Sequence, residues 1–265
     1  MSQFLLRDLS RIEERIRRTP KVSLFLDFDG TLVPLTHIPA EARLDTAARE
    51  ALARFAVNHF FVTTIISGRS IGDLLPRIGL DGIIYAGNHG LEIRGRQLHF
   101  IEPTAAARQD RLREISDEIE GKLRGVEGVI MDRKGLTTTV HYRNAPIREL
   151  AKIEGAIRAA VSGSNDLFLI RTGKMAFEIL PRTGWNKGAA AKWINRSLGC
   201  ERSLSIYLGD DETDEDAFRA LPEGITVKVG NHGVTASRYY VEDTQGVYEF
   251  LNWLENHVSA RTAAD

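Results

Sequence analysis

The sequence has few of the features that mark secreted, membrane or nucleic-acid-binding proteins. Cys200 is the only cysteine among the 265 residues, so no disulfide can form within the chain. It has no run of about 18 apolar residues, which excludes a spanning helix, and residues 1–20 contain no apolar block of the signal-peptide kind. The formal net charge is −1. We therefore expect a soluble, cytoplasmic protein with no bulk affinity for nucleic acid or membranes.

The first part of the chain has the pattern of a parallel α/β sheet. A length of 265 residues suits one large domain, or a core with a smaller one. Leu5, Leu9, Ile12 and Ile16 recur at helical spacing and predict an amphipathic helix over residues 3–18. Apolar strands then alternate with helices, and the strands are predicted at residues 22–27, 61–66 and 81–86. This alternation predicts right-handed crossovers between parallel strands.

The pattern changes between residues 104 and 181. A helix followed by two strands occurs twice in this segment, which indicates an antiparallel sheet with helices; the helices are expected at 105–123 and 146–162, and the strands at 127–133, 136–142, 166–171 and 175–180. The first pattern then returns, with a helix over 187–198 that Asn186 can cap, strands at 204–208, 225–229 and 239–241, and a last helix at 246–258. The expected fold is α/β, with a Rossmann-like parallel-sheet core (1–103 and 182–265) and an inserted α+β domain (104–181).

Two aspartates follow the first predicted strand. Asp27 and Asp29 stand just before Gly30 and Thr31, at the carboxyl end of an apolar run, which is the edge of an open α/β sheet where ligands bind. A turn there can aim both carboxylates at one point, where they repel unless one is protonated or a cation lies between them. Oxygen ligands favour Mg²⁺. The alternative is an ordinary Asp-Gly turn with two solvated acids.

Two further positions suit a phosphate group. Ser67, followed by Gly68 and Arg69, offers a hydroxyl and free backbone N–H groups near a helix start, although Ser67 could equally be a plain N-cap. Lys187 stands at the start of its helix, where the helix dipole disfavours a cation and a bound anion would remove the mismatch. The alternative for Lys187 is a solvated side chain.

A cluster of acidic residues follows the strand at 204–208. Thr213 and Asp216 have the spacing of a capping box, and acidic residues are favourable in a first helical turn. This explanation does not cover Asp210 and Asp211, which come directly after an apolar strand and are therefore candidates for metal binding.

These four clusters resemble, in order and placement, the four motifs of the haloacid-dehalogenase-like phosphotransferases, and the insertion looks like the αββαββ cap of that superfamily. The whole chain resembles the trehalose-6-phosphate phosphatases more closely, and the pattern Gly-Asp-Asp-x-Thr-Asp-Glu is especially characteristic of them. The segments that carry this resemblance are 27–32, 66–69, 86–90, 141–143, 173–174 with Glu178, 186–188 and 208–215. Two residues depart from it: Asn88 stands where many relatives have Glu or another residue, and Met175 where some have a second basic residue.

The resemblance implies roles for the residues of the core. Asp27 would be the nucleophile that forms an aspartyl phosphate, Asp29 the general acid and base, and Lys187 a catalytic cation. Mg²⁺ would be held by the Asp27 carboxylate, the Asp29 backbone carbonyl and Asp210, with Asp211 or Asp214 in the inner or outer shell. The groups implied to hold the phosphoryl oxygens are Gly30, Thr31, Ser67, Gly68 and Lys187.

The resemblance also implies that the cap recognises the sugars. His141 and Arg143 alternate with Tyr142 and would share one face of a strand, and Lys174 and Glu178 lie four residues apart around a turn. A solvated sheet face is the alternative explanation. The full set of expected sugar contacts is Arg69, Asn88, His89, His141, Arg143, Lys174 and Glu178.

The expected activity is hydrolysis of trehalose 6-phosphate, the last step of trehalose biosynthesis, by a Mg²⁺-dependent monomer. Other Mg²⁺-dependent phosphatases, acting on sucrose phosphate or glucosylglycerol phosphate, remain open, as does a phosphosugar mutase. A non-catalytic sensor that kept the fold is the alternative from another class. Retention of Asp27, Asp29, Lys187 and Asp210 argues against a sensor.

Overall fold

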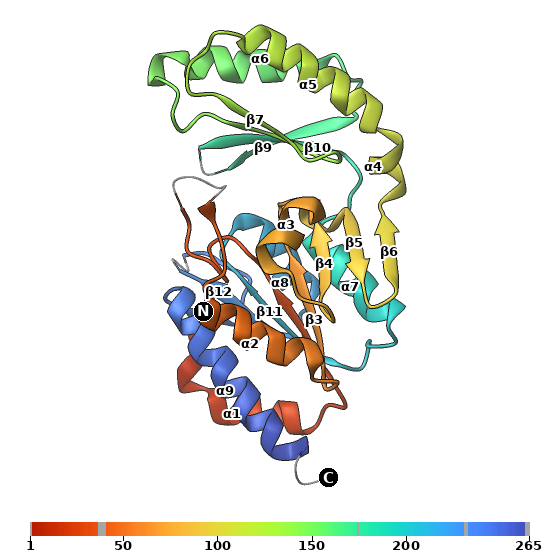
Figure 1. Ribbon diagram of the computed structural model, residues 1–265, viewed down its shortest axis with the longest axis vertical. Coiled ribbons are helices and arrows are strands. Elements are labelled where there is room, and N and C mark those ends of the chain that lie inside the picture. Colours follow the sequence, from red (N-terminus) through yellow and green to blue (C-terminus); the bar gives the residue numbers. More distant parts are fainter. Residues whose placement is uncertain (1, 37–40, 174, 231–232, 263–265) are drawn as a thin grey trace. The chain divides into compact units, whose positions relative to one another are not determined.

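The chain forms two compact units. The computed structural model describes residues 2–36, 41–173, 175–230 and 233–262 (Figure 1). The core unit consists of Met1–Phe100 and Asn186–Asp265, and the inserted unit consists of Ile101–Trp185. The inserted unit contains the predicted segment 104–181 and begins and ends a few residues outside it. Among the described residues, no helix is both long and apolar enough to cross a membrane.

The core unit is built on a nine-stranded sheet with the order β1-β13-β12-β11-β2-β3-β4-β5-β6. Neighbouring strands from β1 to β4 in this order pair in the parallel direction, and β5 pairs with β4 in the antiparallel direction. This sheet confirms the predicted parallel core. The strands are β1 Gln3–Phe4, β2 Val22–Leu26, β3 Phe61–Ile66, β4 Ile84–Gly87, β5 Glu92–Gly95, β6 Leu98–Ile101, β11 Leu204–Gly209, β12 Ile225–Val229 and β13 Tyr239–Val241.

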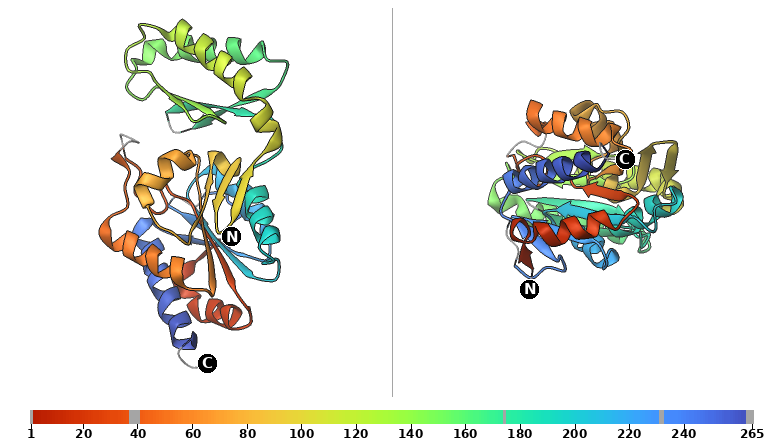
Figure 2. Two further views of the ribbon diagram at one scale, coloured as in Figure 1. Left: turned by 45° about the vertical axis from the view of Figure 1, so that its right-hand side comes forward. Right: turned by 90° about the horizontal axis from the view of Figure 1, so that it is seen from below.

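The middle strands of the sheet are buried on both faces. Every residue of β2, β3 and β12 is buried, which is what a parallel sheet covered by helices requires. Helix α2 packs against α9, and α7 packs against α8 (Figure 2). The helices of the core unit are η1 Leu5–Arg7, α1 Leu9–Arg17, α2 Thr46–Val57, α3 Ile71–Ile78, η3 Asn88–Gly90, α7 Lys187–Ser197, α8 Glu212–Ala220 and α9 Thr244–Thr262.

The inserted unit is an antiparallel sheet with helices, as the sequence predicts. Its four strands have the order β7-β8-β10-β9, and apolar side chains of β8 and β10 form one core with those of α5 and α6. The strands are β7 Ile130–Arg133, β8 Thr138–His141, β9 Phe168–Gly173 and β10 Ala176–Pro181. The helices are α4 Pro103–Ala107, α5 Gln109–Leu123, η4 Ile147–Glu149 and α6 Leu150–Ser162.

The structure corrects the prediction at two places in the core unit. The helix predicted over 3–18 begins only at Leu9, because Gln3 and Phe4 pair with β13 as an edge strand. The hairpin of β5 and β6 was not predicted at all. Its turn residues Arg96 and Gln97 both have positive φ, of 46° and 67°, and they lack the Asn-Gly or Asp-Gly pair that usually marks such a turn.

Candidate active site

Lys187 is the centre of a buried cluster of charges at the carboxyl edge of the core sheet. It is the first residue of α7, after the N-cap Asn186, whose side chain accepts a hydrogen bond from Ala189. Its Nζ lies 2.7 Å from Asp27 Oδ1 and 2.7 Å from Asp214 Oδ1, and the lysine side chain is 2% exposed. The structure thus joins a residue just after β2 to residues more than 150 positions later in the chain.

Burial and pairing shift the protonation of this cluster in opposite directions. Burial raises the pKa of Asp27 well above its ordinary value, although Lys187 opposes the shift. Burial alone would lower the pKa of Lys187, but Asp214 and Asp27 outweigh it and hold that pKa above its ordinary value. The lysine therefore stays protonated beside its two carboxylates at neutral pH.

Asp214 is held by three donors. Its Oδ1 accepts hydrogen bonds from Lys187 Nζ and from the Tyr207 hydroxyl, the latter at 2.7 Å, and its Oδ2 accepts one from the Asp211 backbone N–H at 3.0 Å. Burial, followed by the charge of Asp214, raises the pKa of Tyr207 well above its ordinary value, so the phenol remains a donor. Tyr207 was not predicted, because it lies inside the apolar strand β11, where a tyrosine looks like a core residue.

The capping box of α8 differs from the predicted one. Asp211 is the N-cap and Asp214 its reciprocal partner, so the predicted pair of Thr213 and Asp216 is wrong by two residues. Asp211 is exposed, and its side chain accepts a hydrogen bond from the Glu212 N–H at 2.7 Å. The structure therefore places Asp214, rather than Asp211, beside Lys187 and Asp27.

Asp210 completes a set of oxygens that suits a divalent cation. Carboxylate oxygens of Asp27, Asp210 and Asp214 all lie within 4.8 Å of one another. Carboxylates gathered this closely repel one another unless cations or protons lie between them. Oxygen-only donors are the ligands that Mg²⁺ prefers. Both oxygens of Asp214 already accept hydrogen bonds.

Lys228 fixes the backbone beside Asp210. Its Nζ donates to the carbonyl oxygens of Asp210 at 2.7 Å and Asp211 at 3.2 Å, and the residue is 9% exposed. The lysine lies in β12, the strand next to β11. Like Tyr207, it was not predicted. It is a single lysine within a strand of mostly apolar residues, and this pattern does not indicate a contact with Asp210.

Asp29 is separate from the Lys187 cluster and is paired with Arg69. The guanidinium binds both carboxylate oxygens, Nε to Oδ2 at 2.6 Å and Nη2 to Oδ1 at 2.7 Å. Arg69 also donates to Asp73 at 2.6 Å, and Asp73 accepts from Arg77 at 2.7 Å. Burial would lower the pKa of Arg69, but Asp29 and Asp73 outweigh it and raise it. Asp29 is therefore oriented by a series of three further charges of alternating sign, Arg69, Asp73 and Arg77.

The residues expected to hold phosphate lie at the same edge of the sheet. Gly30 has φ +82°, and a Cβ added there would lie 2.2 Å from Asp210 Oδ2, so any other residue at this position would strain the backbone and displace the Asp210 side chain. Thr31 is fully buried, and its hydroxyl has no hydrogen-bond partner among the described residues. The alternative for Ser67 is wrong, since Ser70 is the N-cap of α3. Ser67 Oγ instead accepts from the Arg69 N–H at 3.2 Å.

Asn88 and His89 follow β4 in an unusual backbone conformation. Their φ angles are 49° and 59°, in the left-handed region that non-glycine residues rarely adopt. The Asn88 amide donates to Glu92 at 2.7 Å, and the same Glu92 oxygen accepts from the Ile71 N–H at the start of α3. The imidazole of His89 lies against Gly68, where an added Cβ would meet it at 2.8 Å. Both residues thus lie beside the Ser67–Arg69 segment.

The sequence comparison identifies a family for this arrangement. Residues 25–248 match the family model described as trehalose-phosphatase. The chain belongs to the trehalose-phosphatase family. Among its relatives, the trehalose-phosphate phosphatase of Mycobacterium ulcerans is 34% identical over 249 residues, which are 91% of this chain and 63% of that protein. The probable trehalose-phosphate phosphatase 3 of Oryza sativa is 32% identical over 263 residues, 88% of this chain and 69% of that protein.

Solved structures agree with the family in fold. A crystal structure of a trehalose-6-phosphate phosphatase related protein superimposes with a TM-score of 0.80 at 27% identity, covering 90% of this chain and 99% of that one. The C-terminal domain of the Candida albicans trehalose-6-phosphate phosphatase gives a TM-score of 0.80 at 21% identity and shows the same fold. The chain spans about 63% of the length of the Mycobacterium ulcerans relative.

The expected sugar contacts of the family's cap lie in the inserted unit. His141 ends β8, and Glu178 in β10 is aligned with Thr139 two residues away, so both side chains are on one face of the sheet. The prediction that Arg143 shares that strand face is wrong, because β8 ends at His141 and Arg143 lies in the following turn. Glu178 forms an ion pair with Lys134 at 3.3 Å. Lys174 lies outside the described residues.

The opposite face of this sheet is apolar. Val140, Phe177 and Ile179 pack onto α5 and α6, which leaves the face of His141 and Glu178 for polar contacts. Burial, followed by the charge of Lys134, lowers the pKa of His141. The imidazole is therefore neutral at pH 7, able both to donate and to accept a hydrogen bond.

Proposed function

We propose that this chain hydrolyses trehalose 6-phosphate to trehalose and phosphate. The observation that carries the proposal is the ion pair of Lys187 with Asp27, 2.7 Å long and buried, with Asp210 beside it. Membership of the trehalose-phosphatase family over residues 25–248 supplies the substrate, because relatives at 32–34% identity carry that name.

In the proposed mechanism, Asp27 attacks the phosphorus atom, and the bond from phosphorus to the sugar oxygen breaks. Asp29 gives its proton to that oxygen and then takes a proton from the water that hydrolyses the aspartyl phosphate, which frees Asp27. Because Asp29 is bound to Arg69 on both oxygens, the pair must open before Asp29 can carry a proton. Arg69 is then available to contact the substrate.

Lys187 lowers the cost of placing negative charge in this pocket. Phosphoryl transfer depends mainly on positioning and on neutralising charge, and the ammonium group is already held within 2.7 Å of the nucleophile. Gly30, Thr31, Ser67 and Gly68 would hold the phosphoryl oxygens, and the unpartnered Thr31 hydroxyl is ready to donate to one. Gly30 and Thr31 follow Asp27 closely in the chain, and Ser67 and Gly68 follow β3, the strand that pairs with β2.

Mg²⁺ is the proposed cofactor; Asp27, the Asp29 backbone carbonyl and Asp210 would hold it, with Asp214 nearby, hydrogen-bonded to Lys187. A bound divalent cation would supply charge neutralisation at the phosphoryl oxygens. The role expected for Asp211 is now limited to the helix cap, since its side chain is exposed and accepts from Glu212.

Sugar recognition is proposed for Arg69, Asn88 and His89 in the core unit and for His141, Arg143 and Glu178 in the inserted unit. Lys174 is kept in this set on the resemblance alone. A disaccharide presents many hydroxyl groups, and these charged, amide and imidazole side chains can pair with them. The cytoplasmic location and the monomeric state remain predictions.

A panel of sugar phosphates tests the proposal. The full chain is incubated with trehalose 6-phosphate, sucrose 6-phosphate, glucosylglycerol phosphate and glucose 6-phosphate, with Mg²⁺ or with EDTA, and both inorganic phosphate and the sugar product are measured. We expect trehalose and phosphate in equal amounts, only with Mg²⁺, and the highest kcat/KM for trehalose 6-phosphate. Faster release from another phosphate would reassign the substrate, and an isomerised sugar phosphate without free phosphate would identify a mutase.

A further inference from the structure

The core unit contains a cavity at the edge of the sheet opposite to the catalytic cluster. Its volume is about 670 Å³, within the range of small-molecule sites. Thr19, Leu204 and Gly224 line it at the amino ends of β2, β11 and β12, whereas Asp27 and Asp210 stand at the carboxyl ends of β2 and β11. The cavity is therefore distinct from the proposed active site.

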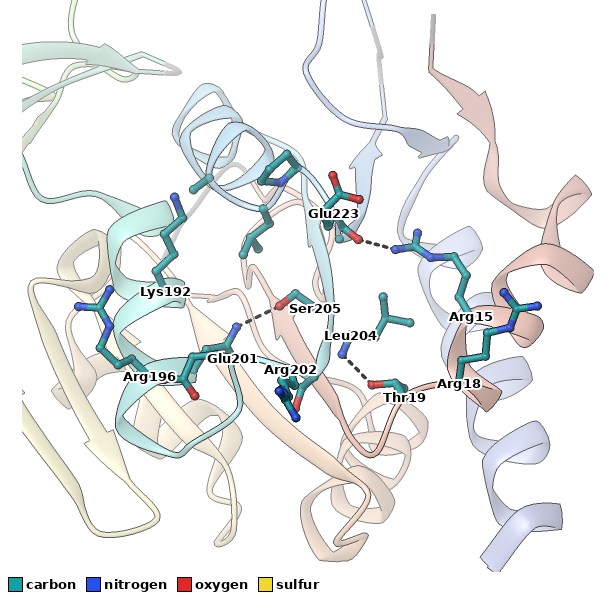
Figure 3. A pocket seen from close by; sticks show the side chains of 16 residues that line it. Arg15, Arg18, Thr19, Lys192, Arg196, Glu201, Arg202, Leu204, Ser205 and Glu223 are labelled. Carbon is teal, nitrogen blue, oxygen red and sulfur yellow. Dashed lines mark hydrogen bonds between the residues drawn. The ribbon is translucent and has the colours of Figure 1, made fainter.

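The lining of this cavity is strongly basic. Five basic side chains line it against two acidic ones, Glu201 and Glu223; the basic ones are Arg15, Arg18, Lys192, Arg196 and Arg202. In Figure 3, Lys192 and Arg196 lie on one side of the cavity and Arg15 and Arg18 on the other, with Arg202 and Ser205 between them. These basic residues come from helices α1 and α7 and from a loop.

Three of these charges have no internal partner. Within the described part of the chain, Lys192, Arg196 and Arg202 form no ion pair, while most exposed arginines of this protein do, such as Arg17 with Glu13. Lys192 and Arg196 stand four residues apart in α7, where like charges repel. The helix dipole favours Arg196 in the last turn, but it does not account for Lys192 or Arg202. An anion in the cavity would compensate all three.

A buried amide adds a second polar feature. Asn195, in the last turns of α7, lines the cavity and is 8% exposed. Its Nδ2 donates to Ser205 Oγ at 3.0 Å, while its Oδ1 has no hydrogen-bond partner in the described residues. A buried acceptor without a donor is costly, but this oxygen is covered by the protein itself and is not open to the cavity. Leu204, Leu221 and Pro222 add an apolar part to the lining.

We propose that this cavity binds a small organic molecule with more than one phosphate group. The phosphates would contact Lys192, Arg196 and Arg202, and the organic part would lie against Leu204, Leu221 and Pro222. The cavity walls come from the far ends of α7, β11 and α8, whose other ends carry Lys187, Asp210 and Asp214. The proposal concerns binding alone and does not depend on the proposed catalytic activity.

Isothermal titration calorimetry with fructose 1,6-bisphosphate as the probe tests the proposal. The full chain is titrated in EDTA, so that no Mg²⁺-dependent hydrolysis occurs, and inorganic phosphate and fructose are titrated separately. The variants are Lys192→Glu with Arg196→Glu, and Arg202→Glu alone. The control is Arg94→Glu with Arg124→Glu, which makes the same change in net charge at two exposed residues outside the cavity.

We expect a saturable site for the bisphosphate that weakens at least tenfold in both cavity variants and is unchanged in the control. Because the substituted side chains are exposed, each variant should unfold at the parent temperature without ligand, and Arg202→Glu lies in a loop and changes no helix. If the parent chain did not bind fructose 1,6-bisphosphate, or if the cavity variants bound it as tightly as the parent, the proposal would be wrong. If inorganic phosphate bound equally tightly at the same residues, the proposal that the ligand is an organic molecule would be wrong.

Discussion

Substitution of Lys187 by Met tests the structural role of the buried ion pairs. Met keeps a long unbranched side chain but removes the ammonium, which lies 2.7 Å from both Asp27 and Asp214 in a site where the lysine is 2% exposed. Removing one partner of a buried pair leaves an uncompensated charge and costs about 3–5 kcal/mol. We expect the free energy of unfolding at pH 7 to fall by this amount in EDTA.

The size of the loss should depend on pH. Burial raises the pKa of Asp27 and Lys187 opposes that shift, so the pKa rises further when the lysine is gone. A carboxyl with a raised folded pKa destabilises the fold when it is ionised, and this penalty disappears below its unfolded pKa of about 4. The difference between Lys187→Met and the parent should therefore be largest at neutral pH and shrink as the pH falls towards about 4.

Urea unfolding followed by tryptophan fluorescence measures this difference. Two of the three tryptophans, Trp193 and Trp253, lie in the core unit, so the signal reports mainly on the unit that contains Lys187. The matched control is Arg17→Met, since Arg17 forms an exposed ion pair with Glu13 in the same core unit and such pairs contribute about 0.3–0.5 kcal/mol. A loss below about 1 kcal/mol for Lys187→Met would refute the reasoning.

Three further predictions follow from the contacts around the site. Tyr207→Phe removes one donor from buried Asp214, so the free energy of unfolding should fall by about 1.5–3 kcal/mol in the same urea assay; no change would show that the hydrogen bond is not formed. Gly30→Ala places a Cβ against Asp210 at positive φ, so the Mg²⁺ concentration for half-maximal phosphate release should rise at least tenfold, while Gly184→Ala, also at positive φ but with open space around it, should match the parent. Burial would raise the pKa of Asp73, but hydrogen bonds from Arg77 and Arg69 outweigh burial and lower this pKa. A carboxylate with a lowered folded pKa stabilises the fold, and this contribution is lost as the pH falls through the folded pKa. Asp73→Asn should therefore lower the free energy of unfolding above about pH 4 and make no difference below the folded pKa. A constant difference across a pH series of urea titrations would contradict the last prediction.

The sequence was most informative where a strand ends in polar residues. Asp27, Ser67 and Asp210 could be placed at one edge of the sheet because the carboxyl ends of parallel strands lie together. Lys187 could be added because a cation at a helix start opposes the helix dipole. These patterns are local, and the sheet brings them together without any further information.

The residues that support this edge could not be predicted in the same way. Tyr207 and Lys228 lie inside strands, where alternation and apolar neighbours predict packing, and their contacts with Asp214 and Asp210 arise only when β11 and β12 pair. The start of α8 was misplaced by two residues, because Asp211, Thr213, Asp214 and Asp216 can all act in a cap. That shift decides which acid lies beside Lys187.

The inserted unit was predicted in outline but not in detail. The repeated helix–strand–strand pattern identified its sheet, whereas the end of β8 at His141 depends on the pairing with β10. The strand was predicted to end at residue 142 and ends at His141, and Arg143 therefore lies in a turn rather than on a strand face. Strand ends are set by the partner strand, and the sequence of one strand does not contain that information.

Phosphate release by Asp27→Asn tests the central claim most directly. With trehalose 6-phosphate and Mg²⁺, we expect the variant to lose at least 10³-fold in kcat, since an amide cannot replace the carboxylate as nucleophile, while its circular dichroism spectrum stays that of the parent. Asp81→Asn, at an exposed position of the core unit, should retain full activity. Release of phosphate by Asp27→Asn at the parent rate would contradict the account.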